Sequence, residues 1–554
     1  MFYSTKLIEK YGRHSGFAVE QSSIRQPPSI YRLISMPLKR YLLLLITYFA
    51  ITGCSVNPVT GEQQLMFTSM SEDIEIGKKQ YKPAQQSQGG LYYLDTKLNT
   101  YISTVGKKLA KVSDQPELPY EFVVLNNSVP NAWALPSGKI AINRGLLVQL
   151  KSEAQLAAVL SHEIVHAAAR HGAQRMRDNL FVQAGIAGLG LTLSDNDYRS
   201  LIIGGASLGA QLTVAKYGRD HELESDKYGM KYMAKAGYDL QGAVDLQTLF
   251  VMLSKGQKSS WIDGLFASHP PSPERVAENK KHLFTLQNQT AGKFSGKEEF
   301  QAALAYLRKQ QPAYDLADQA SHALIKQQTK QALSLINKAI KLEPKEAQFR
   351  SIKGLILDHQ GKSDLALKEH NRATELYPQQ FSYYLNRANT QLSLGNLTAA
   401  QQDYQRSMKM LPTSTAALQL GHLFKNSGNP SQAIPYYSQV SNVQGKEGQD
   451  ARLNLALLEI HEKPEKYLKV KHQQDPKGPL LVTIENHSPL DIKKVTLISQ
   501  LFDDKRNMIK EGSWHITEPL KAGERSRYFP VPVSYHLKPN EHIKTKIQKV
   551  LISN

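Results

Sequence analysis

The chain has 554 residues, of which 41% are hydrophobic and 21% are charged. This composition is typical of globular domains and excludes a wholly disordered, collagen-like or coiled-coil protein. The single cysteine, Cys54, excludes an intramolecular disulfide and a zinc site built from cysteines, so a bound metal would need His, Asp or Glu ligands. Lysine and arginine outnumber aspartate and glutamate by 68 to 49. Because no long basic run occurs, we expect this charge to be spread over solvated surfaces and expect no nucleic-acid partner.

Residues 1–53 have the pattern of an export signal. A basic pair precedes an apolar run at residues 41–51, and small residues follow it. Residues 1–35 are unusual for the basic segment at the start of such a signal, so Met36 is the expected start. The apolar run is shorter than the ~20 residues that span a membrane. The tetrapeptide Ile-Thr-Gly-Cys that ends at Cys54 resembles a bacterial lipobox, which implies acylation of this cysteine, and Ser55 in place of Asp implies the outer membrane. The alternative is a plain signal anchor with an incidental cysteine.

The next part of the chain predicts a mixed α+β fold. Apolar spacing predicts helices near residues 70–81 and over residues 95–111. Residues 122–125 and 139–142 have strand character and are separated by turn-forming residues. From residue 152 to residue 285 the pattern is predominantly helical.

Two apolar segments rich in Gly and Ala lie within this helical part, at residues 182–193 and 201–214. Either could be mistaken for a membrane span. Both are too short to cross a bilayer, and their small residues favour close packing, so we expect buried core helices.

A repeat of 34 residues begins near residue 313. Proline and alanine recur at this spacing in Pro344, Pro378 and Pro412 and in Ala332, Ala366 and Ala400. Small residues where two helices touch, followed by a closing proline, resemble the tetratricopeptide repeat. Four units at residues 313–447 and a capping helix at 451–460 predict an α-solenoid. The resemblance implies that this array binds client or partner proteins.

The last part of the chain, residues 463–554, differs in composition from the repeats. Short β-type runs at residues 480–485, 495–501 and 527–533 are separated by Pro and Gly and show no helical period. They predict a small β-sandwich. No group of potentially catalytic residues occurs here, and the role of this part stays open.

His162, Glu163 and His166 form an H-E-x-x-H pattern on a predicted helix. Positions i and i+4 share a helix face, so the two imidazoles can converge on one ion. Glu163 is turned by about 100° from His162, which places its carboxylate beside the ion. There it can take a proton from a water molecule activated by zinc.

A catalytic zinc ion needs a third protein ligand and keeps one position open. The metzincin arrangement is excluded. Ala169 occupies the position of its glycine, Gly172 occupies the position of its third histidine, and His171 lies one residue short of that position. The third ligand must therefore come from farther along the chain. Residues 220–229 are rich in potential ligands.

Within that segment, Glu222 and Asp226 lie at i and i+4 on one helix face. Glu222 could bind zinc while Asp226 accepts the Nδ1 proton of a ligand histidine and orients it. Glu224 is turned about 200° from Glu222 and is expected to be structural. His221 remains an alternative ligand.

These motifs together resemble the gluzincin family of zinc metallopeptidases that includes the heat-shock protease HtpX and the CAAX prenyl protease. Residues 131–134 with Gly138, and Gly229 after the acidic pair, extend the resemblance. The leader, residues 57–61 and the repeats are similar to the periplasmic branch of that family, the β-barrel assembly-enhancing proteases. The β domain at 463–554 has no counterpart in the resemblance.

The resemblance implies one zinc ion per chain, bound by His162, His166 and Glu222, with Glu163 as the general base. It also implies a role for the segment that contains His269 and Arg275. These two residues can stabilise an oxyanion, or His269 can occupy the open zinc position as a latch. A histidine in an ordinary surface loop is the third alternative.

Lys139, Ile140, Ala141 and Ile142 are expected to form an edge strand above the zinc ion. An exposed edge can pair with an extended peptide through main-chain hydrogen bonds, which leaves sequence selectivity weak. The alternative is an interior strand that is paired on both sides.

The sequence therefore predicts a multidomain, mainly α protein. Its parts are the export signal with its lipobox (1–53), an α+β zincin-like metallopeptidase domain (54–312), an α-solenoid of tetratricopeptide repeats (313–462) and a small β-sandwich (463–554). The expected function is a zinc endopeptidase, anchored to the outer membrane in the periplasm, that cuts misfolded or misassembled envelope proteins, with repeats that contact the assembly machinery. The alternatives are a non-enzymatic assembly factor with a latent zinc site and an inner-membrane protease that spans the bilayer with residues 182–214.

Overall fold

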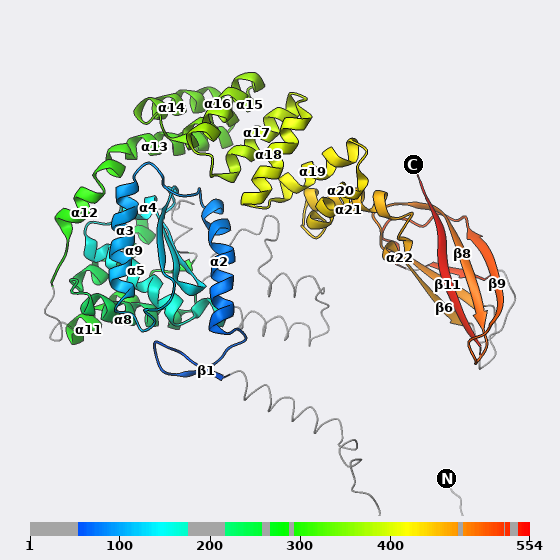
Figure 1. The fold of residues 1–554 in the computed structure, drawn as a ribbon, viewed down its shortest axis with the longest axis horizontal. Coiled ribbons are helices and arrows are strands. Elements are labelled where there is room, and N and C mark those ends of the chain that lie inside the picture. Colours follow the sequence, from blue (N-terminus) through cyan, green and yellow to red (C-terminus); the bar gives the residue numbers. More distant parts are fainter. Residues whose placement is uncertain are drawn as a thin grey trace, which may run out of the picture. The chain divides into compact units, whose positions relative to one another are not determined.

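The structure is a computed structural model, which describes residues 54–175, 217–256, 266, 268–286, 293–474, 480–525, 527–531 and 541–553 (Figure 1). The chain divides into two units, Met1–Cys54 and Ser55–Asn554. The predicted leader at 1–53 and the apolar segments at 182–193 and 201–214 lie outside the described residues. Among the residues described, no helix has the length and apolar character needed to cross a membrane.

The first part of the second unit is an α+β domain around a three-stranded sheet in the order β3-β5-β4. Strand β3 runs parallel to β5, and β4 runs antiparallel to it. The elements are α2 (Met70–Ser87), α3 (Thr96–Ala110), β3 (Glu121–Leu125), β4 (Ala132–Leu135), β5 (Lys139–Asn143), α4 (Arg144–Leu147), α5 (Glu153–Ala168), α8 (Arg219–Lys235), α9 (Gln241–Gly256) and α11 (Pro273–Leu286). Both predicted helices and both predicted strands are confirmed, and β4 is an addition.

The prediction that Lys139, Ile140, Ala141 and Ile142 form an edge strand is wrong. These residues belong to β5, which pairs with β3 on one side and with β4 on the other. The cause is a tight turn in which Ser137 and Gly138 adopt φ values of 71° and 75°. This turn folds the preceding segment back along β5, so that β3 and β4 are the edges of the sheet in the described part of the chain.

Helix α5 carries the H-E-x-x-H motif and is buried along its whole length. It begins after Ser152, whose hydroxyl caps the helix by accepting a hydrogen bond from the Gln155 amide. Helices α8 and α9 pack against it. A Cβ atom at Gly229 of α8 would lie 3.1 Å from Ser161 Oγ of α5, so the glycine permits the two helices to cross closely beside the motif.

The tetratricopeptide array is confirmed as a series of helical hairpins. They are α13 (Ala305–Ile325) with α14 (Thr329–Leu342), α15 (Ala347–His359) with α16 (Ser363–Leu376), α17 (Phe381–Ser393) with α18 (Leu397–Met410), and α19 (Ser414–Asn426) with α20 (Pro430–Val440). Helix α21 (Lys446–Glu459) follows the last pair. The alanines that recur at 34-residue spacing are buried where paired helices touch.

The α+β domain and the first repeats share one hydrophobic core. Its buried members extend from Leu98 of α3 through Leu160 of α5 to Tyr314 of α13 and Ile356 of α15. Hydrogen bonds also join the two parts, as between Gln86 of α2 and the carbonyl of Gln379. The first repeats are therefore packed onto the α+β domain.

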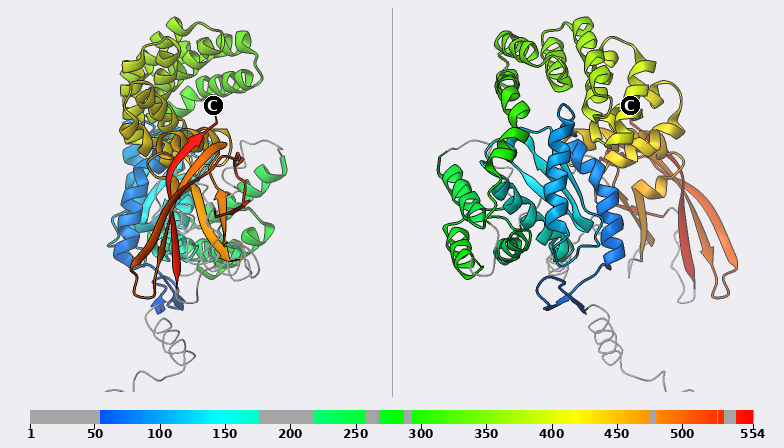
Figure 2. Two further views of the ribbon diagram at one scale, coloured as in Figure 1. Left: turned by 90° about the vertical axis from the view of Figure 1, so that its right-hand side faces the viewer. Right: turned by 60° about the vertical axis from the view of Figure 1, so that its left-hand side comes forward.

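The C-terminal part consists of two three-stranded sheets, which Figure 2 shows in two orientations. One sheet has the order β10-β7-β6 and the other β11-β8-β9. The strands are β6 (Leu468–Gln474), β7 (Leu480–Asn486), β8 (Ile492–Phe502), β9 (Met508–Ile516), β10 (Arg527–Pro530) and β11 (His542–Ile552). Buried side chains of both sheets form one core, in agreement with the predicted sandwich. Strands β6, β9 and β11 were not predicted because they carry many charged or exposed residues.

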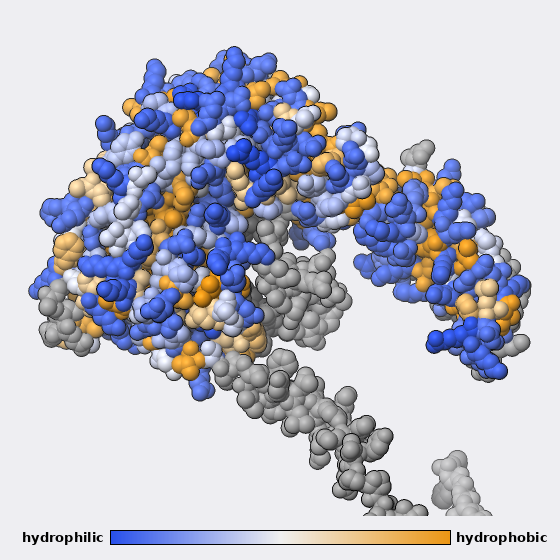
Figure 3. Space-filling model, viewed as in Figure 1, coloured by the Kyte–Doolittle hydropathy of each residue, from blue (hydrophilic) through white to orange (hydrophobic). Residues whose placement is uncertain are grey.

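The face of the molecule seen in Figure 3 is mainly hydrophilic, with hydrophobic residues scattered between charged ones. Exposed apolar side chains such as Ile325 and Leu397 lie singly on the repeats. Such scattered residues are normal on a soluble surface and do not by themselves mark a binding site.

Candidate metal centre

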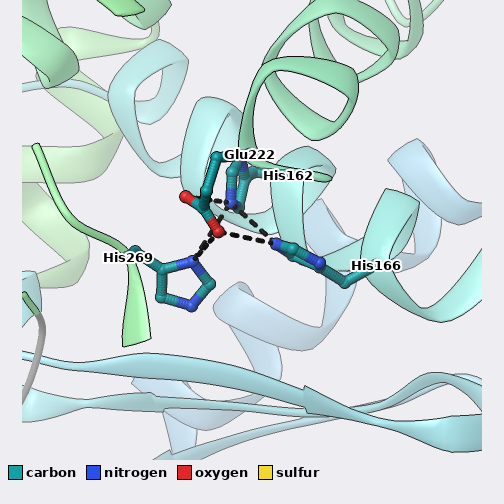
Figure 4. Close-up of side chains that lie close together, drawn as sticks. All are labelled: His162, His166, Glu222 and His269. Carbon is teal, nitrogen blue, oxygen red and sulfur yellow. Dashed lines mark hydrogen bonds and ion pairs between the residues drawn. The ribbon is translucent and has the colours of Figure 1, made fainter. Parts of the chain in front are cut away.

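Four side chains from three parts of the α+β domain meet at one point: His162 and His166 of α5, Glu222 of α8 and His269 from the segment before α11 (Figure 4). One potential ligand atom from each residue lies within 4.8 Å of the others. The Nε2 atoms of His162 and His166 are 3.0 Å apart. Glu222 contributes carboxylate oxygens 3.6 Å from His162 Nε2 and 3.4 Å from His166 Nε2. We call this group the four-residue cluster.

Each motif histidine has one ring nitrogen inside the cluster, Nε2, and one outside it, Nδ1. Metal binding needs a free lone pair on Nε2. His162 Nδ1 lies 2.9 Å from Asp226 Oδ1, so it donates its hydrogen to the carboxylate and leaves a lone pair on Nε2. Burial lowers the pKa of His166 well below its usual value and keeps this imidazole neutral. Two inward-facing imidazole nitrogens beside a carboxylate are the donor set that zinc prefers, and they fit a cation between them.

Arg275 supplies the positive charge behind the cluster. Its Nε and Nη2 atoms donate to the two oxygens of Asp226 at 2.7 Å each, and Nη1 lies 2.6 Å from Glu222 Oε2. Burial alone would raise the pKa values of both acids, but Arg275, together with His269 in the case of Glu222, lowers them. Both carboxylates are therefore held ionised.

Arg275 contacts acidic groups of the site, and its possible role beside an oxyanion stays a prediction. Its donors are directed at Asp226, Glu222 and the Pro270 carbonyl, and its side chain is buried. Arg275 thus orients and neutralises the acidic groups. The sequence could not reveal this, because the partners lie 49 and 53 positions away in the chain.

His269 belongs to the cluster. Its Nδ1 atom lies 2.9 Å from Glu222 Oε1 and 3.3 Å from His162 Nε2, and the residue is only 3% exposed. The interpretation as an ordinary surface-loop histidine is therefore wrong. Burial opposes protonation, but the carboxylates of Glu222 and Glu163 raise the pKa of His269, so a proton on this ring and a metal ion would compete for the same centre.

Glu163 lies beside the cluster, as the helix geometry predicts. Its Oε1 atom is 3.4 Å from His269 Nε2, while Oε2 has no hydrogen-bond partner in the described part of the chain. Burial raises the pKa of Glu163, and this effect is partly offset by His269 and His162. The carboxylate is free to exchange a proton with a molecule bound at the cluster.

Glu224, which was expected to be structural, and His221, the alternative metal ligand, both lie outside the cluster. Glu224 contacts His171 and accepts a hydrogen bond from Asn57. The alternative ligand His221 bonds to Gln174 instead, with Nε2 3.0 Å from Oε1. Neither Glu224 nor His221 supplies an atom to the four-residue cluster.

Sequence reasoning missed Tyr217, which precedes α8. Its ring stacks on His166 at a centroid separation of 3.8 Å, and burial raises the pKa of its hydroxyl to about 12. The tyrosine therefore stays neutral and fixes the plane of the imidazole. No local pattern marks this residue, because its partner lies 51 positions earlier.

Comparison with known proteins agrees with this geometry. The profile described as "Peptidase family M48" matches residues 96–282, and tetratricopeptide-repeat profiles match residues 317–381 and 381–413. The "Putative beta-barrel assembly-enhancing protease" of Vibrio cholerae is 28% identical over 193 residues, covering 34% of this chain and 39% of the relative. The Escherichia coli "Beta-barrel assembly-enhancing protease" is 25% identical, covering 38% and 45%.

A mitochondrial protein is similar as well. The "Mitochondrial metalloendopeptidase OMA1" of Schizosaccharomyces pombe is 29% identical over 232 residues, covering 41% of this chain and 65% of the relative. The chain thus spans between about two fifths and two thirds of the length of these relatives. From the profile matches and the geometry of the site, the chain combines a metallopeptidase domain of family M48 with tetratricopeptide repeats.

Proposed function

We propose that this chain is a zinc-dependent endopeptidase in which His162, His166 and Glu222 bind one zinc ion and Glu163 is the general base. The observation that carries the proposal is the convergence of the two motif histidines with a glutamate from another helix within a buried cluster. Two imidazoles and a carboxylate that leave one position open are the ligand set of catalytic zinc.

A bound zinc ion would supply Lewis acidity and lower the pKa of water to about 7. The protein's own residues would then move the protons. The unpartnered Oε2 of Glu163 takes a proton as water attacks the peptide carbonyl, and the same carboxyl can return it to the departing amine. Asp226 and Arg275 hold His162 and Glu222 in position during this exchange.

Strand β4 (Ala132–Leu135) is the candidate surface for an extended substrate. It is an edge of the sheet in the described residues, and Ala132 lines the same cavity as Glu163 and His269. A peptide that adds to this edge would be held by main-chain hydrogen bonds, which suits a protease that cuts unfolded chains with little sequence preference.

The remaining parts of the proposal concern location and clients. The lipobox-like segment supports acylation of Cys54 and attachment to the outer membrane from the periplasmic side. The repeats and the similarity to proteins named beta-barrel assembly-enhancing proteases support misfolded or misassembled envelope proteins as clients, and contact with the outer-membrane assembly machinery.

The replacement Glu163→Gln tests the activity. It keeps the shape of the side chain and removes the base, so cleavage of an unfolded protein should fall by about 10²–10⁴-fold while bound zinc, measured by elemental analysis, is retained. Wild-type protein incubated with a chelator should be equally inactive. If E163Q fully complements a deletion strain, the non-enzymatic assembly factor is the better interpretation.

His269 is proposed to be a latch that occupies the fourth metal position. The support is the place of its Nδ1 atom among the ligand atoms of the cluster. Under this proposal His269→Ala should raise proteolysis and self-cleavage. A role in oxyanion stabilisation predicts the opposite, a loss of about 10²–10³-fold with zinc retained. Loss of activity in a variant that still binds zinc would exclude the latch.

A further inference from the structure

The two histidines of the H-E-x-x-H motif have different outer partners. His162 Nδ1 contacts a carboxylate directly, that of Asp226. His166 Nδ1 instead faces a third histidine, since His171 Nδ1 lies 2.9 Å away. His171 is completely buried, three residues beyond the end of the motif helix at Ala168, and the proposed reaction gives it no role.

The direction of hydrogen bonding from His166 outward is determined once its Nε2 atom binds a metal. The hydrogen of the neutral ring then resides on Nδ1 and is donated to His171 Nδ1. His171 must therefore carry its own hydrogen on Nε2. That atom lies 3.3 Å from Glu224 Oε1. The two atoms are not in hydrogen-bond geometry in the described part of the chain, but the nearby carboxylate favours the ring form with its hydrogen on Nε2. The two imidazoles and the acid thus have one consistent proton arrangement.

The carboxylate of Glu224 is itself fixed from the N-terminal side. Asn57 Nδ2 donates to Glu224 Oε1 at 3.1 Å, and Asn57 is 4% exposed. The turn that holds Asn57 lies between β1 (Cys54–Val56) and β2 (Gln63–Leu65). Asn57 Oδ1 accepts from the Val59 amide at 2.9 Å, so the side-chain amide is clamped with its donor directed at Glu224.

We propose that Asn57, Glu224 and His171 form a positioning arm that orients His166 and so sets the metal affinity of the site. The sequence Asn-Pro-Val-Thr-Gly at 57–61 is thereby assigned a function, since its turn connects the N-terminal end of the second unit to the metal centre. This inference rests on the proposed binding of zinc by His166.

Replacing His171 is the first test. His171→Phe keeps the ring volume and the stack on His221, whose centroid lies 4.3 Å away, but removes the acceptor for His166 Nδ1. Loss of an outer hydrogen-bond partner of a metal ligand reduces affinity by about 10–100-fold. We expect that loss in chelator competition, and a shifted visible absorption spectrum after substitution with Co²⁺. The control is His221→Phe, which removes the neighbouring imidazole and should leave the affinity and the spectrum unchanged.

A swap of amide and acid is the second test and does not depend on a buried ring. Asn57→Asp keeps the oxygen that caps the turn and replaces the donor by an oxygen that repels Glu224, so zinc affinity should fall. Adding Glu224→Gln removes this repulsion, because the side chain at position 224 is then neutral. The Oε1 atom of Glu224 is the one that both Asn57 and His171 contact, so the amide can re-form only one of the two contacts. The double variant should therefore regain part of the lost affinity.

The outcomes separate this inference from the proposed function. Wild-type protein without stoichiometric zinc would contradict the proposed function itself. Wild-type protein that binds zinc, together with His171→Phe of unchanged affinity and an unchanged Co²⁺ spectrum, would overturn the positioning arm alone. The same conclusion follows if Asn57→Asp lowers the affinity and Glu224→Gln fails to restore any of it.

Discussion

Two regions of the molecule bury a glutamate, and they treat its charge in opposite ways. In the metal centre Glu222 is 1% exposed and faces the cation of Arg275 at 2.6 Å. Where the first repeat meets the α+β domain, Glu346 is completely buried. Its oxygens accept from neutral donors, the Tyr314 hydroxyl at 2.7 Å and the Asn126 amide at 3.1 Å. We call this second region the repeat junction.

The pKa values of the two acids differ accordingly. Burial would raise both, but His269 and Arg275 hold the pKa of Glu222 well below its usual value. Burial prevails at Glu346 and raises its pKa, because hydrogen bonds from neutral groups and the more distant Arg144 compensate only in part. The opposed cation, and not the depth of burial, therefore decides whether a buried carboxyl stays ionised.

The largest effect is expected from removing the cation in the metal centre. Arg275→Met leaves Asp226 and Glu222 buried without their counter-ion, which should lower the free energy of unfolding by about 3–5 kcal/mol. Urea denaturation in the presence of a chelator, followed by tryptophan fluorescence, measures this effect without a contribution from metal. The counterpart at the junction is Arg144→Met. Arg144 donates to Asn126 and stacks on Tyr314, so its loss should cost less. Equal losses in the two variants would contradict the comparison.

The sequence predicts the regions in which a pattern repeats or a motif is local. The 34-residue spacing of alanine and proline predicted the repeat array because each unit satisfies the same packing requirement. The H-E-x-x-H motif and the i, i+4 pair Glu222 and Asp226 predicted the inner cluster, because helix geometry alone places those side chains. The repeat junction carries no such signal, since Glu346 meets Asn126 across 220 positions.

The second prediction uses the opposite pKa shifts. The raised pKa of Glu346 means that the folded state holds this proton more tightly, so its stabilising contribution is complete below the unfolded value of about 4.3 and is lost as pH rises through the folded pKa. Glu346→Gln cannot titrate. Its stability relative to wild type should therefore increase between pH 4 and pH 7.

Glu222→Gln in metal-free protein is the matched counterpart. The lowered pKa of Glu222 gives a contribution that is present above the unfolded value and lost as pH falls. This variant should therefore become less stable relative to wild type as pH rises toward about 4.3, and the difference should then stay nearly constant. Urea denaturation of both variants and of wild type from about pH 3 to about pH 7 measures how each difference in stability changes with pH. If the stability relative to wild type changes with pH in the same direction for both variants, the charge states assigned to Glu346 and Glu222 are wrong.

Two contacts near the site are absent from the sequence-based interpretation, and one of them makes it wrong. Residues 139–142 were expected at a sheet edge because the hairpin partner, β4, is only four residues long and lacks a clear alternation of polar and apolar positions. The contacts of Arg275 with Asp226 and Glu222 were not predicted, because these two acids come from another helix. The first contact joins the two strands of one hairpin, and the second joins segments 49 and 53 positions apart. In both cases the local sequence of the partner gives no sign of the contact.

The smallest effect concerns two adjacent tyrosines beside the repeat junction. The Tyr93 hydroxyl donates to the Lys345 carbonyl at 2.8 Å and accepts from the Ala347 amide at 2.7 Å, while its ring stacks on Tyr377 at 4.3 Å. Tyr93→Phe keeps the stack and removes both hydrogen bonds, which should cost about 1 kcal/mol in the free energy of unfolding.

Tyr92→Phe is the control for the same substitution one residue earlier. The Tyr92 hydroxyl is buried and has no hydrogen-bond partner among the residues that the structure describes. Removing a buried polar group that is not hydrogen-bonded should be neutral or slightly stabilising. Because Tyr93 binds the backbone at the start of α15, only Tyr93→Phe should also speed limited proteolysis between the α+β domain and the repeats. Equal behaviour of the two variants would mean that the junction is held by apolar packing alone, and that its polar contacts, unlike those of the metal centre, contribute no stability.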